Sequence, residues 1–117
     1  MKIYCYDRCT TCKKALSWLD AKGINYEKID IKSSNPDEAT LREWHKKSGL
    51  PLRKFFNTSG ILYREMELSK KLPTISEDEQ FRLLAGDGMM VKRPILITDS
   101  AVLVGFKEDE WEKAAKI

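Results

Sequence analysis

Residues 1–32 read MKIYCYDRCTTCKKALSWLDAKGINYEKIDIK, and three patterns follow one another in this stretch. The run Lys2–Tyr6 is typical of a β-strand, and Asn25–Ile31 places apolar residues among charges as a second strand does. Between them, over about Thr10–Lys22, apolar side chains recur at helical spacing until Gly23 ends the helix. We therefore predict a βαβ unit with parallel strands and a right-handed crossover.

Helices are predicted for the middle of the chain, from about residue 33 to residue 90. One helix is expected to begin at Asn35–Pro36, with the asparagine as its cap and the proline in its first turn. A short helix is expected over Tyr63–Leu72. A further helix is expected to begin at Ser76, because Ser76 and Glu79 match the capping box.

Strands return after this helical segment. Ile95–Thr98 and Val102–Val104 are β-prone runs separated by a turn, which predicts a hairpin. A last helix carries Trp111 on its apolar face and acidic residues in its first turn, where the helix dipole favours them. The predicted order is therefore β-α-β, a helical segment, and β-β-α, which is an α/β arrangement without internal repeats or linkers.

Length and composition limit the class of protein. The chain has 117 residues, which is enough for a single domain over residues 1–117 and too few for two independent cores. Hydrophobic residues make up 42% and charged residues 33%, as expected of a packed core with a solvated surface. The 21 basic and 18 acidic residues are mixed along the chain, so we expect no direct nucleic-acid partner. No apolar run approaches the roughly 18 residues that span a bilayer, and no signal peptide is recognisable, so we expect a cytoplasmic protein without a membrane partner.

The three cysteines lie within the first twelve residues, too close together to cross-brace a secreted domain. Cys9 and Cys12 form a C-x-x-C motif where the first strand meets the first helix, which is typical of redox or metal sites. Cys9 is expected at the helix N-terminus, where free N–H groups, the helix dipole and the nearby Arg8 and Lys13 favour a thiolate, so we predict that it is the nucleophile. Cys12 lies one turn deeper, and we predict that it resolves the reaction through an internal disulfide.

Two other interpretations of this motif are open. The two cysteines could be ordinary buried thiols, or they could be ligands of a structural zinc ion. A zinc site usually needs four ligands, and the chain offers only Cys5 and His45 in addition. Cys5 shares strand parity with Ile3 and is expected in the core, whereas His45 is expected on a solvated helix face. We therefore expect no metal, and the lack of a glycine-rich nucleotide motif predicts no cofactor.

Arg93 and Pro94 form a second candidate site, just ahead of the third predicted strand. A proline that opens a strand is ordinarily trans, although X–Pro bonds are the only ones for which the cis form is cheap. Lys92 and Arg93 are either solvated charges or a source of positive charge for a thiolate or an oxyanion. Met89–Met90 is expected to fill the core.

Together these motifs resemble the arsenate reductase (ArsC)/Spx family of bacterial proteins. The resemblance rests on the strand followed by Cys9–Lys14, on Lys92–Leu96 and on the closing Gly105–Phe106, and it covers essentially the whole chain. It implies a thioredoxin/glutaredoxin-like mixed sheet, with a helical insertion between strands 2 and 3 at about 33–90. It also implies that the Arg93–Pro94 bond is cis and lies against the cysteine loop.

The resemblance further implies the site. Cys9 occupies the position of the arsenate-attacking cysteine, and Arg93 looks like one of the three arginines that accompany it in arsenate reductases. Asn57 and Phe106–Lys107 stand where the other two arginines are expected, which counts against arsenate reduction. Cys12 stands where those reductases usually carry a serine, and a second cysteine at this spacing resembles the redox switch of Spx. The residues expected to bind the substrate are Arg8, Thr10, Thr11, Lys13 and Pro94.

We expect an enzyme, a thiol-disulfide oxidoreductase in which Cys9 attacks a disulfide, an oxidised thiol or an oxyanion and Cys12 closes the internal disulfide. The expected partner is a small thiol or a thioredoxin- or glutaredoxin-type reductant. One alternative is a redox-sensing regulator like Spx that docks on RNA polymerase. The other is a true arsenate reductase.

Overall fold

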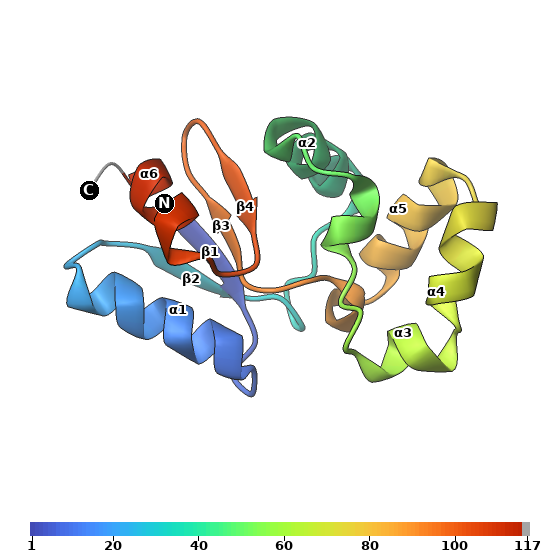
Figure 1. The fold of residues 1–117 in the computed structure, drawn as a ribbon, viewed down its shortest axis with the longest axis horizontal. Coiled ribbons are helices and arrows are strands. Elements are labelled where there is room, and N and C mark those ends of the chain that lie inside the picture. Colours follow the sequence, from blue (N-terminus) through green and yellow to red (C-terminus); the bar gives the residue numbers. More distant parts are fainter. Residues whose placement is uncertain (116–117) are drawn as a thin grey trace.

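The computed structural model describes residues 1–115, in which a small sheet lies beside a group of helices (Figure 1). The strands are β1 (Lys2–Cys5), β2 (Glu27–Asp30), β3 (Ile95–Ile97) and β4 (Val102–Val104). The α-helices are α1 (Thr10–Ala21), α2 (Glu38–Ser48), α3 (Ile61–Glu65), α4 (Leu68–Lys71), α5 (Glu77–Gly86) and α6 (Glu108–Ala115). Short 3-10 helices lie between them at η1 (Leu52–Phe55), η2 (Leu72–Thr74) and η3 (Gly88–Met90).

The four strands form one mixed sheet in the order β2-β1-β3-β4. β1 and β2 are parallel, and α1 is the crossover between them, as the pattern of residues 1–32 predicts. β3 is antiparallel to both β1 and β4, with Leu96 opposite Ile3 on one side and Leu103 on the other. The predicted βαβ unit and the predicted hairpin are therefore confirmed, and together they make the mixed sheet.

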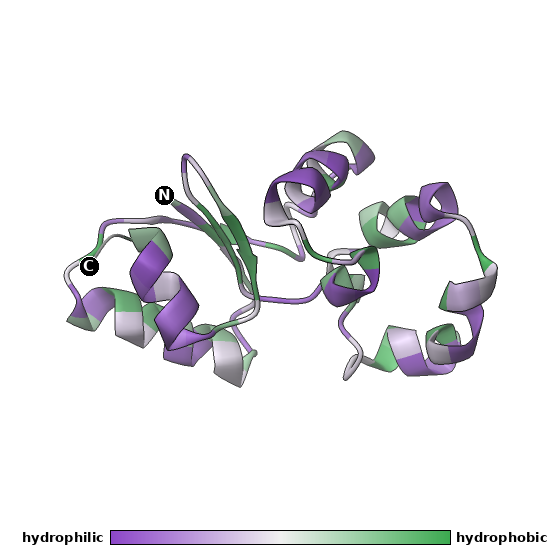
Figure 2. Ribbon diagram, turned by 45° about the horizontal axis from the view of Figure 1, so that its top comes forward, coloured by the Kyte–Doolittle hydropathy of each residue, from purple (hydrophilic) through white to green (hydrophobic). Residues whose placement is uncertain are grey.

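Each face of the sheet buries its own group of apolar side chains, and β3 and β4 are hydrophobic throughout (Figure 2). On one face, α1 and α6 cover Ile3, Cys5 and Leu96, and Trp111 of α6 is fully buried against them. The other face packs against the helical insertion, where the ring of Tyr4 meets the ring of Trp44 edge-on at 4.7 Å. None of the helices within residues 1–115 is long and apolar enough to cross a membrane.

Backbone contacts join the insertion to the sheet. The N–H of Lys92 donates to the carbonyl of Phe55 at 2.7 Å, and the N–H of Asn57 donates to the carbonyl of Met90 at 2.8 Å. Gly88 packs so closely against the carbonyl of Ile31 that a Cβ atom at Gly88 would overlap its oxygen. The segment that leads into β3 is therefore held between the end of β2 and the residues after η1.

The expected cap of α2 is wrong. Asp37 caps this helix, its carboxylate accepting the N–H of Thr40 at 2.8 Å, and Pro36 lies before the helix rather than in its first turn. Asn35, the predicted cap, instead donates from its side chain to the carbonyl of Ala85 at 2.7 Å. A carboxylate at the N-terminus also interacts favourably with the helix dipole, which supports the later start.

The expected helix over Tyr63–Leu72 is interrupted. Glu67 adopts a left-handed backbone conformation, with φ of 51°, and separates α3 from α4. The interruption lets α4 turn so that Leu68 and Leu72 are buried. The start of α5 is confirmed, because the Ser76 hydroxyl accepts the N–H of Glu79 at 3.2 Å.

The expected solvated position of His45 is also wrong. Its ring is partly buried and lies edge-on to the rings of Phe55 and Phe81, with ring centroids 6.1 and 5.7 Å away. The neighbouring Lys46 and Lys47 are exposed, so only one side of this part of the helix is solvated.

Replacing Gly88 tests the junction between insertion and sheet. We expect Gly88→Ala to lower the free energy of unfolding by about 3 kcal/mol, the upper end for overpacking, because the new methyl group meets backbone rather than a movable side chain. Gly86→Ala is the matched control: a Cβ there has no neighbour within 4 Å, and we expect stability to be unchanged or raised by up to about 1 kcal/mol. Urea unfolding measures both, and equal midpoints for the two variants would contradict this view of the junction.

Candidate functional site

Cys9 is the N-cap of α1. β1 ends at Cys5, a short loop turns the chain, and the backbone of Cys9 is extended, with φ of −91° and ψ of 118°. Its Sγ accepts the backbone N–H of Cys12 at 3.4 Å, and its own N–H donates to the carbonyl of Tyr6 at 3.0 Å. Free N–H groups and the positive end of the helix dipole stabilise negative charge at such a position. The predicted place of Cys9 at the start of the helix is therefore confirmed.

Cys12 lies beneath Cys9, in the core between α1 and the sheet. Its side chain is 1% exposed, and its Sγ accepts the N–H of Tyr6 at 3.5 Å. The N–H of Cys12 donates to the Cys9 Sγ at 3.4 Å, and Cys5 belongs to the same buried group. The neighbouring Cys5 thiol and burial raise the pKa of Cys12, so this thiol keeps its proton at neutral pH.

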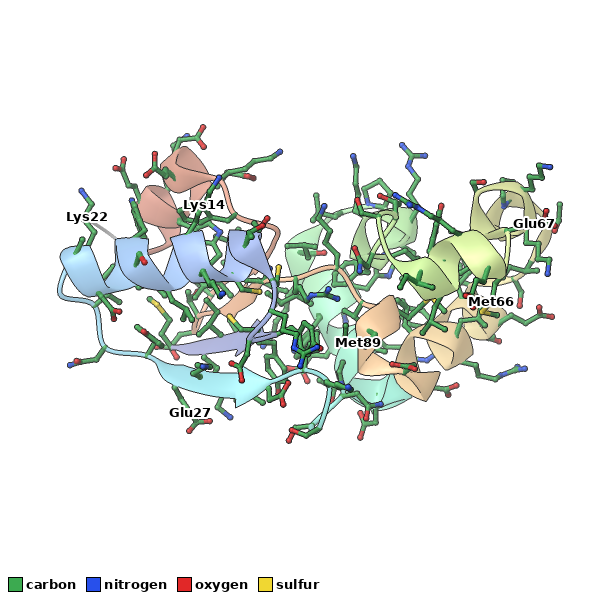
Figure 3. All side chains as sticks on the ribbon, turned by 90° about the horizontal axis from the view of Figure 1, so that it is seen from below. Lys14, Lys22, Glu27, Met66, Glu67 and Met89 are labelled. Carbon is green, nitrogen blue, oxygen red and sulfur yellow. The ribbon has the colours of Figure 1, made fainter. Side chains whose placement is uncertain are left out.

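A cleft of about 670 Å³ opens over Cys9, between the start of α1 and the insertion. One wall comes from the cysteine loop and the other from the segments around α3 and η3; Met89, labelled in Figure 3, lies between the sheet and the helices of the insertion. Of the described residues that line this cleft, Arg8, Lys92 and Arg93 are basic and none is acidic. The cleft therefore suits a ligand that carries negative charge.

Arg93 lines this cleft and has buried hydrogen-bond donors without an acceptor among the described residues. Its guanidinium carbon lies 5.2 Å from the centre of the Tyr6 ring, a cation–π contact that helps to fix the side chain. Within residues 1–115, nothing accepts a hydrogen bond from Nε or Nη1 of Arg93, although both nitrogens are buried. Buried guanidinium donors usually have an acceptor, so these two nitrogens are unusual, and the charge of Arg93 at the cleft is suited to attract an anion.

The structure brings most of the predicted site residues together. Cys9 and Arg93 share the cleft, and Cys12 is buried behind Cys9. The predicted substrate-binding residues that line the same cleft are Arg8, Thr10 and Thr11.

Two predicted substrate-binding residues lie elsewhere. Lys13 lines a separate surface hollow with Lys14 and Trp18, since it projects from another side of α1. Pro94 is buried and does not line the cleft, although the Arg93–Pro94 peptide bond is cis, as the resemblance implies.

Several residues of the insertion that line the cleft were not predicted from the sequence: Ser59, Gly60, Ile61, Leu62 and Met89. Asn57 also lines it, at the position where the family resemblance expects an arginine. Ile61 is unusual among them, because this large apolar side chain is 72% exposed at the cleft. The sequence feature that could have identified it is an isoleucine at a helix start, directly after Ser59–Gly60. Phe106–Lys107 lines an adjoining cleft that shares Thr11 and Arg93.

Metal ligation has little support in the part of the chain that the structure describes. No group of three or more histidine, cysteine, aspartate or glutamate side chains there is arranged to hold a metal ion. All three cysteines are free thiols.

The sequence and the fold match a known family over nearly the whole chain. The ArsC family model matches residues 4–114. This chain belongs to the ArsC family. Among solved structures, an ArsC family related protein from Bacteroides fragilis is 50% identical with a TM-score of 0.94, over 97% of this chain and 95% of that one. A glutaredoxin from Archaeoglobus fulgidus, 14% identical, shares the fold with a TM-score of 0.51 over 99% and 85% of the two chains.

Relatives with curated names support the same family. The uncharacterized protein YusI of Bacillus subtilis is 48% identical over 97% of this ArsC protein and 96% of its own length. An arsenate reductase of Neisseria meningitidis is 29% identical over 90% and 89%, and the global transcriptional regulator Spx 2 of Bacillus anthracis is 22% identical over 95% and 83%. The resemblance to the ArsC/Spx family and the thioredoxin/glutaredoxin-like mixed sheet with a helical insertion are therefore confirmed.

The different exposure of the thiols predicts how this ArsC protein is alkylated. We expect N-ethylmaleimide to label Cys9 alone in the folded chain, because Cys5 and Cys12 are each 1% exposed. In guanidinium chloride all three thiols should be labelled. Intact mass gives the number of labels, and tryptic peptides identify the labelled residue. If Cys12 in the folded chain were labelled as fast as Cys9, the burial of Cys12 beneath Cys9 would be contradicted.

Proposed function

We propose that this ArsC family protein is a thiol-disulfide oxidoreductase in which Cys9 is the nucleophile and Cys12 the resolving thiol. The observation that carries the proposal is the placement of the Cys9 sulfur: it caps α1, faces an open basic cleft, and has the protonated Cys12 thiol directly beneath it. A thiolate is the attacking form in disulfide exchange, and the helix N-terminus favours that form.

The reaction has two exchange steps. The Cys9 thiolate attacks one sulfur of the substrate disulfide, which forms a mixed disulfide and releases the other substrate sulfur as a thiolate. Cys12 then gives its proton to solvent and attacks the Cys9 sulfur, which forms the Cys9–Cys12 disulfide and releases the second substrate thiol. The substrate gains two electrons, and the two cysteines lose them. Because the pKa of Cys12 is raised, loss of its proton makes this second step faster as pH increases.

Thiols in the cell complete the cycle. We propose that a small thiol, or a thioredoxin- or glutaredoxin-type protein, reduces the internal disulfide by the reverse exchange. A cytoplasmic location follows from this need, because that compartment keeps thiols reduced.

The charges of the cleft favour an anionic substrate. A small disulfide that carries carboxylates can pair with Arg8, Lys92 and Arg93, all of which line the cleft. An oxyanion such as arsenate has the same kind of charge. However, Asn57 and Phe106–Lys107 stand where arsenate reductases of the family carry arginines, so disulfides are the better-supported substrate class.

The second candidate function is redox sensing of the Spx type. It is favoured by the C-x-x-C pair and by the exposed Ile61, which lines the same cleft as Cys9 and offers an apolar contact for a partner. In this alternative the oxidised chain would dock on RNA polymerase. Repeated turnover of a disulfide with a thiol donor supports the enzyme, whereas a single oxidation that changes polymerase binding supports the sensor.

Removing the resolving thiol should trap the intermediate. We expect Cys12→Ser, treated with glutathione disulfide, to accumulate one glutathione per chain on Cys9, because nothing beneath Cys9 can displace the glutathione sulfur. Cys9→Ser, the matched control, should form no adduct. Intact mass measures both. An adduct on Cys9→Ser but not on Cys12→Ser would reverse the assigned roles.

Arg93 should increase the rate at which Cys9 reacts with anionic disulfides more than with cationic ones. We expect Arg93→Ala to slow the reaction of Cys9 with glutathione disulfide on the order of tenfold, the value of one charge-assisted hydrogen bond, and to leave the reaction with the cationic disulfide cystamine unslowed. Arg82→Ala removes an equal charge from exposed α5 and serves as the control. Stopped-flow rates with both disulfides decide the matter: equal slowing of the two would point to a packing role for Arg93.

A further inference from the structure

Cys5 is a buried thiol that the mechanism above does not use. It is the last residue of β1, four residues before Cys9, and its side chain is 1% exposed. Strand parity turns it toward α1, where it belongs to the same buried group as Cys12 and Trp111. A cysteine in this setting is ordinarily a small core residue.

The neighbour of Cys5 makes its position unusual. Cys5 and Cys12 belong to one buried group between β1 and α1, and the Cys12 Sγ accepts the N–H of Tyr6, the residue that follows Cys5, at 3.5 Å. The Cys12 N–H in turn donates to the Cys9 Sγ at 3.4 Å. Cys12 therefore lies next to both of the other cysteines, with Cys9 at the cleft and Cys5 in the core.

We propose that Cys5 is a third redox cysteine, which attacks the Cys12 sulfur of the Cys9–Cys12 disulfide. This exchange forms a buried Cys5–Cys12 disulfide and returns Cys9 to a free thiol. This inference rests on the proposed function, because the substrate disulfide is the oxidant that first forms the Cys9–Cys12 bond. It adds a second, internal exchange to that reaction.

The exchange is balanced without any further reactant. Cys5 gives up its proton and attacks the Cys12 sulfur. The Cys5–Cys12 bond forms as the Cys9–Cys12 bond breaks, and Cys9 leaves as a thiolate that can take up a proton. One disulfide and one thiol are present before and after, so no electrons enter or leave the chain. Two equivalents of a small thiol, or one dithiol protein, are needed later to reduce the buried disulfide.

The surroundings of the sulfurs favour this direction. In the Cys9–Cys12 disulfide the N-cap sulfur is uncharged, and the helix end has no negative charge to stabilise. Transfer to Cys5 frees the sulfur at that position, and a helix N-terminus favours the departure of a sulfur as a thiolate. Both residues of the new disulfide are buried, and a disulfide is uncharged. Its formation therefore carries no free-energy cost of placing a charge in the core.

Trypsin separates the two possible disulfides. Cleavage after Lys2, Arg8 and Lys13 places Cys5 in peptide 3–8 and both other cysteines in peptide 9–13. A Cys9–Cys12 bond stays within peptide 9–13, whereas a Cys5–Cys12 bond joins the two peptides. The reduced full-length chain is treated with one equivalent of glutathione disulfide, quenched at intervals with N-ethylmaleimide, digested at mildly acidic pH and analysed by mass spectrometry.

We expect peptide 9–13 with an internal disulfide to appear first and to be replaced by the joined peptides, with the maleimide label on Cys9. In Cys5→Ala, which substitutes one small buried residue for another, the internal disulfide of peptide 9–13 should persist and Cys9 should stay unlabelled. A Cys9–Cys12 bond that persists in the wild-type chain overturns the relay and leaves the proposed function intact. If no disulfide forms at all and Cys9 takes up no glutathione, the relay and the proposed function both fail.

Discussion

The hydrogen bond from the Cys12 N–H to the Cys9 sulfur is the constraint on which the site depends. It satisfies one of the amide groups that α1 would otherwise leave unpaired at its first turn. Serine, threonine, asparagine and aspartate are the residues that usually cap a helix in this way. Cys9 therefore caps the helix with a side chain that can also react. The same bond places Cys12 beneath Cys9, so the depth of the second thiol is determined by the start of the helix.

The segment that leads into β3 adds positive charge to that of the cysteine loop. Arg8 comes from the loop between β1 and α1, whereas Lys92 and Arg93 come from the segment that leads into β3. Backbone hydrogen bonds fix that segment to the residues after η1, so Arg93 is positioned by main-chain pairing and by the ring of Tyr6 rather than by an acidic partner. The positive charge at the cleft stays available to a ligand for this reason.

Local patterns in the sequence predicted the parts of the structure that local forces determine. The alternation around Ile3 and the helical spacing up to Leu19 were sufficient for the βαβ unit, and the same spacing placed Cys9 at the helix start. The cap of α2 was missed because Asn35 and Asp37 are both good caps, and the choice between them depends on the distant carbonyl of Ala85.

The parts that were missed in the site depend on long-range contacts. Parity showed that Cys5 is buried, but not that Cys12 faces it, since the register between a strand and a helix is a tertiary property. The wall of the cleft at Ile61 has the same origin: this residue is distant in sequence from Cys9 and reaches the cleft only through the packing of the insertion. The left-handed backbone at Glu67 was missed because a glycine is the usual sequence signal for that conformation, and this position holds a glutamate.

The contact of Gly88 with the Ile31 carbonyl bears on how such a domain can diversify. At this point a contact between two backbone segments, and not the size of a side chain, determines the spacing between the sheet and the insertion. Residues on the insertion side of the cleft can therefore be exchanged during evolution without changing how far apart its walls stand. Descendants of one ancestor can acquire new preferences through Asn57–Leu62, while the sulfur chemistry at the end of α1 is inherited unaltered.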